Sequence, residues 1–180
     1  MVFALRTLIL IPLMYSLADL KKTLGSIPED FEAASSEFWD YVCKKLKIFE
    51  GKAKVVYSEK TITDRGESAV DVLMVKLRKG NTEFHCVDDP LLAAEVEGWL
   101  DLMKNGQNKV ALELFEESLR ERDQYSLGVI DRTLDDSKIG VLLIDPARRI
   151  SFPDSIKVIR MCPFDPVDYL KRHLVQLKSE

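Results

Sequence analysis

The sequence has few of the residues on which several common kinds of site depend. Only two of its 180 residues are histidines, and its three cysteines lie far apart with no C-x-x-C pair. These numbers and spacings exclude a zinc site of the usual kind, and we expect free thiols in a reducing, cytoplasmic compartment. The eight glycines form neither G-x-G-x-x-G nor G-x-x-x-x-G-K-[ST]. Neither an NAD site nor a P-loop nucleotide site is therefore expected.

The chain also lacks an excess of positive charge. Its 26 Lys+Arg stand against 30 Asp+Glu, so the net charge is −4 and nucleic-acid binding, which usually needs a basic face, is not expected. The apolar stretch at residues 7–13 is too short for a membrane span, which takes about 20 residues. What remains is an ordinary globular composition, with 46% apolar and 31% charged residues. The length predicts a single domain over residues 1–180.

The N-terminal segment has two interpretations. One positive charge, a short apolar stretch and Ser16-Leu17-Ala18 together resemble a signal peptide with a cleavage site. The other interpretation is a buried strand, because Leu8-Ile9-Leu10-Ile11 is a short β-rich run that ends at Pro12. We favour the strand because the apolar stretch is short.

Runs with β-type composition alternate with segments of helical periodicity. The expected strands are Thr7–Pro12, Ala53–Tyr57, Glu83–Val87, Ile139–Asp145 and Ser155–Met161. The expected helices start near Ser26 (with Glu29 in a capping box), Ser68, Asp89, Asn108, Gln124 and Asp165. This alternation predicts a three-layer, Rossmann-like α/β fold with a mainly parallel sheet of about five strands. Residues 146–154 are few for a crossover, so either they hold a one-turn helix or the last strand pair is antiparallel.

Polar side chains follow each of the five expected strands, and four of the five strand ends carry a carboxylate within a few positions. Ligands of open α/β sheets bind outside the carboxyl ends of the strands, so these side chains form the list of candidates. The carboxylates could act as general acid and base or hold Mg²⁺ or Mn²⁺, and an arginine could clamp an anion. Asp89 and Asp165 precede prolines and are expected to cap helices instead. The candidates for acid–base work or cation binding are Asp19, Glu59 and Asp88, and those for ligand binding are Tyr15, Ser16, Asp145 and Arg148.

Several segments together resemble an uncharacterised prokaryotic family of small α/β proteins. They are Leu8–Pro12 with Asp19 and Gly25-Ser26, Phe38-Trp39, Val55–Tyr57, Asp88–Leu92 with Glu95, Arg122-Asp123, and Ile139–Ile144. The resemblance adds Glu95, Arg122 and Asp123 to the candidates. It also implies histidines after the first and fourth strands, where this chain has Tyr15 and, at about the second place, Arg148. The family supplies no established activity.

Two functions are therefore expected to compete. The first is a small enzyme or ligand-binding domain that takes a small anionic or phosphorylated ligand, with or without a divalent cation, at the strand ends. The second is a non-catalytic protein-interaction module whose cleft has lost its chemistry, and a homo-oligomer would be compatible with it. The missing histidines favour the second function, and the carboxylates at strand ends favour the first.

Overall fold

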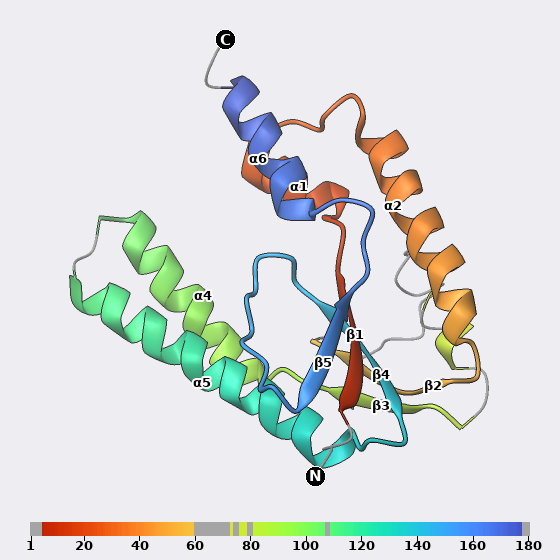
Figure 1. Cartoon of the computed structure of the whole chain (residues 1–180). Coiled ribbons are helices and arrows are strands. Elements are labelled where there is room, and N and C mark those ends of the chain that lie inside the picture. Colours follow the sequence, from red (N-terminus) through yellow and green to blue (C-terminus); the bar gives the residue numbers. More distant parts are fainter. Residues whose placement is uncertain (1–4, 60–72, 74–75, 79–80, 107–108, 178–180) are drawn as a thin grey trace.

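The computed structural model describes residues 5–59, 73, 76–78, 81–106 and 109–177. Five strands form one sheet in the order β3-β2-β4-β1-β5, and every neighbouring pair is parallel (Figure 1). The strands are β1 (Arg6–Pro12), β2 (Ala53–Ser58), β3 (Glu83–Cys86), β4 (Ile139–Ile144) and β5 (Ile156–Arg160). The expected α/β fold with a parallel sheet is thus confirmed, and residues 6–12 form a strand.

The two most apolar strands lie in the interior of the sheet, where both faces are covered. In β1, Ile9 and Ile11 pack into one core and Leu8 packs into the other, and all three are fully buried. The same division holds for β4, where Val141 and Leu142 face opposite sides. A strand between two helical layers has no solvent-facing side, so its sequence shows no polar alternation.

One face of the sheet is covered by α1 (Leu17–Leu24), α2 (Phe31–Leu46) and α6 (Pro166–Leu177). Phe38 of α2 is fully buried there, with its ring 5.6 Å from that of Phe164. The helix expected from Ser68 lies almost wholly outside the described residues. The capping box expected at Ser26 and Glu29 is wrong, because α2 begins at Phe31 with Asp30 as its N-cap.

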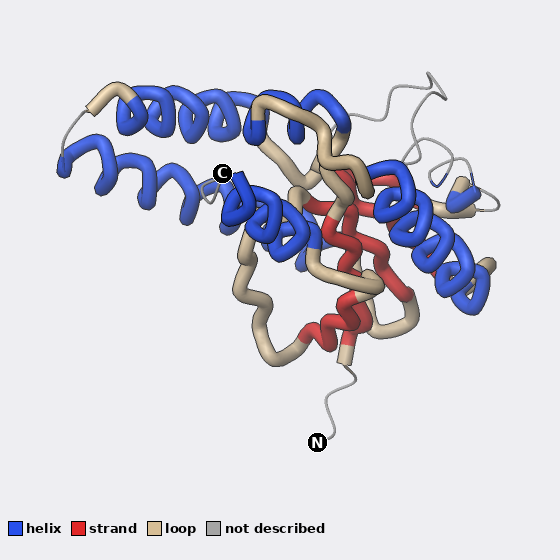
Figure 2. Tube along the Cα trace, turned by 90° about the horizontal axis from the view of Figure 1, so that it is seen from above, coloured by secondary structure: helices blue, strands red, loops and turns tan. Residues whose placement is uncertain are grey.

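The other face is covered by the C-terminal half of α5 (Lys109–Thr133), against which α4 (Pro90–Lys104) packs. Residues 109–133 form one helix, so the two separate helices expected from Asn108 and Gln124 are wrong. Together α4 and the first half of α5 project beyond the sheet as a two-helix arm (Figures 1 and 2). Asp89 caps α4 as predicted, accepting from the amides of Leu91 and Leu92.

The connection from β4 to β5 is shorter than the usual crossover between parallel strands. Residues 145–155 pass across β1 without a helix, and β5 pairs with β1 in parallel. Both expected alternatives, a one-turn helix and an antiparallel last strand, are therefore wrong. Ile150 and Phe152 pack against the core on the α5 side, so apolar side chains of the connection cover this part of the sheet in place of a helix.

Helix α1 follows β1 after a short link and is held by a reciprocal cap. Ser16 accepts from the amide of Asp19 at 3.1 Å, while the Asp19 carboxylate accepts from the Ser16 amide at 3.3 Å. Loss of such a cap costs about 1 kcal/mol. Ser16→Ala should therefore lower the free energy of unfolding by about 1 kcal/mol in urea titrations. Ser36→Ala, in an exposed part of α2, is the control. Equal losses in the two variants would contradict the cap.

Candidate functional site

The sheet has a switch point between β2 and β4. In the chain, β2 is followed by β3 on one side of it, whereas β4 is followed by β5 on the other side. Where successive connections of a parallel sheet leave neighbouring strands in opposite directions, a crevice opens at their carboxyl ends, and ligands of this fold class bind there. The residues that directly follow β2 and β4 are therefore the first to examine.

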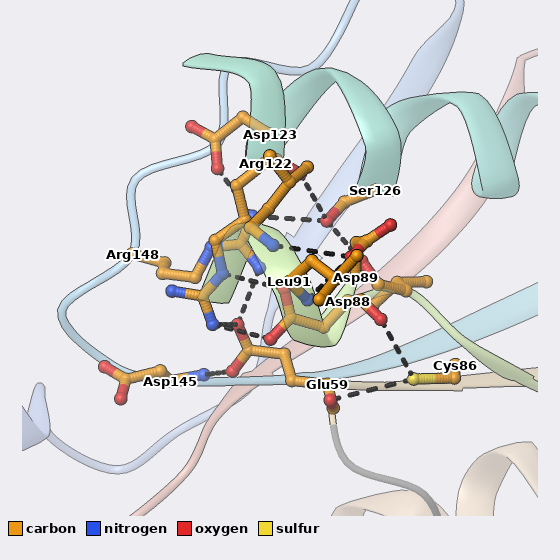
Figure 3. Close-up of polar contacts among 12 residues, drawn as sticks. Glu59, Cys86, Asp88, Asp89, Leu91, Arg122, Asp123, Ser126, Asp145 and Arg148 are labelled. Atoms are coloured by element: carbon orange, nitrogen blue, oxygen red, sulfur yellow. Dashed lines mark hydrogen bonds and ion pairs between the residues drawn. The ribbon is translucent and has the colours of Figure 1, made fainter. Parts of the chain in front are cut away.

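Glu59 and Arg148 meet at this switch point (Figure 3). Glu59 directly follows β2, and Arg148 lies in the connection after β4. Arg148 Nη1 donates to Glu59 Oε1 at 2.6 Å, and the second carboxylate oxygen of Glu59 accepts from the backbone amide of Asp145. Both side chains are almost fully covered, with 6% of Arg148 and 10% of Glu59 exposed. One carboxylate thus fastens the ends of two neighbouring strands to each other.

A second ion pair lies beside the first and joins β3 to α5. Arg122 of α5 donates from Nε and Nη2 to the two carboxylate oxygens of Asp88, at 2.7 and 2.6 Å. These hydrogen bonds raise the pKa of Arg122; burial opposes the shift, and the charges of Asp88 and Glu59 add to it. Arg122 Nη2 also lies 3.8 Å from Glu59 Oε1. The two ion pairs therefore form one connected network.

One turn of α5 supplies the remaining members. Asp123 Oδ1 accepts from Arg148 Nη2 at 2.6 Å, and Ser126 Oγ lies 3.2 Å from the same nitrogen. Ser126 is fully buried and donates to the carbonyl of Val87. We call these six residues the arginine cluster: Glu59, Asp88, Arg122, Asp123, Ser126 and Arg148. It combines three carboxylates with two guanidinium groups at the ends of three strands.

The two arginines differ in how their hydrogen-bonding edges are used. In Arg122, the edge formed by Nε and Nη2 is fully occupied by Asp88. In Arg148, Nη2 of the corresponding edge donates to Asp123, but Nε is buried without a hydrogen-bond partner among the described residues. A buried donor without a partner costs about 1–3 kcal/mol. Arg148 therefore has a fork that is half used.

Four of the residues predicted from the sequence come together in the cluster: Glu59, Asp88, Arg122 and Arg148. Asp145 lies next to them but contributes its backbone amide, while its carboxylate accepts from the amide of Ala147. Asp123, which like Arg122 was a candidate through the family resemblance, is also in the cluster. Ser126 was missed because it lies within an expected helix and the candidates were taken from residues that follow strands.

The other predicted residues are not members of the cluster. Ser16 and Asp19 form a capping box at the N-terminus of α1, where the Asp19 carboxylate bonds to Ser16. Burial raises the pKa of Tyr15 to about 12, and the nearby carboxylates of Asp145 and Asp165 add to the shift. Glu95 lies on the arm, where it accepts from Ser118 at 3.0 Å.

The carboxylates of the cluster do not form a cation site. Within the described ranges, no group of three or more histidine, cysteine, aspartate or glutamate side chains is arranged to hold a metal ion. Glu59, Asp88 and Asp123 each face a guanidinium, which takes the oxygen atoms that Mg²⁺ or Mn²⁺ would need.

No helix in the described part of the chain is both long and apolar enough to cross a membrane.

Comparison with known proteins found no relative. No family model matches the chain, and no curated protein and no solved structure is significantly similar to it. The residues of the arginine cluster and their geometry are therefore the basis for any functional conclusion.

Proposed function

We propose that this protein binds a small anionic ligand, a carboxylate or phosphate ester, at the carboxyl ends of β2 and β4, with Arg148 as the anion-binding group. The observation that carries the proposal is the half-used fork of Arg148. A planar guanidinium edge matches two oxygen atoms of one anion, and such paired, charge-assisted hydrogen bonds are the strong ones. Asp123 satisfies only one of the two nitrogens on this edge.

Asp123 is the group that such a ligand would displace. Its side chain is 30% exposed, the highest value among the three carboxylates of the cluster, whereas Glu59 and Asp88 are at most 10% exposed. A ligand that replaced Asp123 would bind both Nε and Nη2 and satisfy the buried donor. Glu59 would continue to hold Nη1, so Arg148 would stay in place. Asp123 thus acts as the chain's own competitor for the site.

Removal of this competitor should strengthen anion binding. Asp123→Ala should bind inorganic phosphate and ribose 5-phosphate about tenfold more tightly than the unmodified protein, equivalent to about 1.4 kcal/mol. Isothermal titration calorimetry at low ionic strength is the measurement, since salt weakens ionic contacts. Arg148→Lys keeps the charge but removes the fork, so binding should be lost.

A matched control separates a local effect from a change of net charge. Asp136→Ala removes one negative charge at the opposite, amino end of β4. It should leave the affinity for phosphate unchanged. An equal gain in both variants would show that net charge alone sets the affinity, and failure of both Asp123→Ala and the unmodified protein to bind either anion would refute the proposal.

A non-catalytic interaction module is the second candidate. The observation that favours it is that every carboxylate of the cluster already contacts an arginine, so the protein's own side chains fill this edge of the sheet. Absence of anion binding in the calorimetry would favour this second candidate.

Three cysteines, none in a disulfide, support a reducing compartment such as the cytoplasm for either function.

A further inference from the structure

The charges of the arginine cluster do not balance. Three carboxylates, on Glu59, Asp88 and Asp123, stand against the two guanidinium groups of Arg122 and Arg148, so the formal net charge of the cluster is −1. Among the described residues, no lysine and no third arginine forms an ion pair with these carboxylates. The cluster therefore holds more negative charge than its own cations neutralise.

This imbalance restricts the ligand that could replace Asp123 on Arg148. A simple anion would leave the displaced carboxylate of Asp123 beside a second negative group. Glu59 and Asp88 are at most 10% exposed, so water does little to screen the charges of the cluster. A carboxylate that loses its counter-ion in such surroundings is strongly unfavourable. A ligand that brings a positive charge of its own avoids this effect.

The contact that Asp123 makes shows where that positive charge belongs. Asp123 Oδ1 lies 2.6 Å from Arg148 Nη2, one of the two nitrogens that a ligand carboxylate would bind (Figure 3). The other nitrogen is Nε, which is buried without a hydrogen-bond partner among the described residues. After the exchange, the ligand oxygen on Nη2 would lie next to the carboxylate of Asp123. A cationic group close to that oxygen could therefore pair with Asp123.

An α-amino acid has its two charged groups at this short spacing. Its carboxylate and its ammonium are attached to one carbon atom, so the ammonium lies beside a carboxylate oxygen. An ammonium has three hydrogen-bond donors and no acceptor, which suits a carboxylate partner. We propose that the ligand is an α-amino acid, with its carboxylate on Nε and Nη2 of Arg148 and its ammonium on Asp123. This assignment depends on the proposed function, in which Arg148 binds the anion.

Glycine and two smaller compounds that each carry one of its charges test the proposal. Acetate has the carboxylate without the ammonium, and methylamine has the ammonium without the carboxylate. Glycine should bind the unmodified protein about tenfold more tightly than acetate, because it makes one more charge-assisted hydrogen bond, and methylamine should not bind. NMR titration at constant ionic strength measures the affinities, with the Nε–H signal of Arg148 as the local probe. The Nε–H of Arg122, which donates to Asp88, is the internal reference.

Asp123→Ala should change the two affinities in opposite directions. The variant removes the competitor of acetate and the partner of the glycine ammonium, so acetate should bind more tightly and glycine more weakly than in the unmodified protein. Asp136→Ala removes one negative charge at the amino end of β4 and is the matched control. It should leave the ratio of the two affinities unchanged.

The titrations also separate failure of this proposal from failure of the proposed function. Equal affinities of glycine and acetate in the unmodified protein, or changes in the same direction in Asp123→Ala, would overturn the amino acid as ligand and leave Arg148 as an anion site. Glycine binding that persists in Arg148→Lys would place the ligand elsewhere and overturn both. Absence of binding by glycine and by acetate in both the unmodified protein and Asp123→Ala would also overturn both.

Discussion

Replacing Arg148 by methionine should lower the free energy of unfolding by about 3–5 kcal/mol, the usual cost of removing one partner from a buried ion pair. Arg148 is 6% exposed and binds two carboxylates, Glu59 and Asp123. Without the guanidinium, the nearly buried carboxylate of Glu59 would lose its nearest counter-ion and retain only Arg122, whose Nη2 lies 3.8 Å away. Urea titration measures the change, and calorimetry should show a melting temperature lower by at least several degrees.

The neighbouring arginine is the matched control for this variant. Arg149 is 55% exposed and lies 3.5 Å from Asp165 in a surface ion pair. Such pairs contribute between about 0 and 1 kcal/mol, so Arg149→Met should have little effect. Losses of the same size at both positions would contradict a special role for the buried pair.

A double variant tests the coupling directly. If Glu59 and Arg148 stabilise the fold through each other, Glu59→Gln combined with Arg148→Met should cost less than the two single losses added together, because each single change already removes their shared contact at 2.6 Å. Additive losses would mean that the two side chains act independently.

Replacing Phe38 by alanine should also cost about 3–5 kcal/mol, the range for truncation of a buried phenylalanine. Phe38 is fully buried beneath α2, and its ring makes edge contacts with those of Trp39 and Phe164 at 5.2 and 5.6 Å. Because Phe164 lies between β5 and α6, the cavity would loosen the packing between α2 and the last part of the chain.

Denaturant unfolding followed by tryptophan fluorescence measures this loss. Ile48→Ala near the end of α2 is the control, since Ile48 is 61% exposed and surface substitutions usually change stability by no more than about 0.5 kcal/mol. A loss below about 1 kcal/mol in Phe38→Ala would contradict the packing described for α2.

The strands could be predicted from the sequence because each has a local signature. The apolar run of β1 and the glycine-containing run of β4 have no polar alternation, and both lie in the interior of the sheet. The order of the strands could not be predicted, because no local pattern says that β1 lies between β4 and β5. Rules for parallel sheets limit the choices but do not select one.

Part of the candidate site could be predicted for a similar reason. Glu59, Asp88 and Arg148 directly follow strands or lie close to strand ends, and the carboxyl ends of parallel strands share one edge. The sequence also contained a signal against Asp19, since Ser16-x-x-Asp19 has the spacing of a capping box. Asp19 was instead selected as a carboxylate that follows the first expected strand.

The contribution of α5 was missed because polar residues interrupt its buried face. Ser118 and Ser126 are at most 3% exposed and Arg122 is partly buried, so a search for an apolar stripe divides the helix at this place. The interruption has a physical cause, because each polar side chain donates a hydrogen bond. Ser118 donates to Glu95, Arg122 to Asp88, and Ser126 to the carbonyl of Val87. Polar residues at the inward positions of a helix can therefore point to a site.

The central position of β1 has a consequence for the synthesis of the protein. Both strands that pair with β1 come from residues 139–160, far along the chain from residues 6–12. At about 5–20 residues per second, a ribosome needs roughly 6 to 30 s to reach them. Until then only the β2–β3 pair of the sheet has both of its strands. One of the two most apolar strands therefore waits without its partners, and unpaired strand edges of this kind are prone to aggregate. Folding of this chain should depend on chaperones that shield β1 during translation.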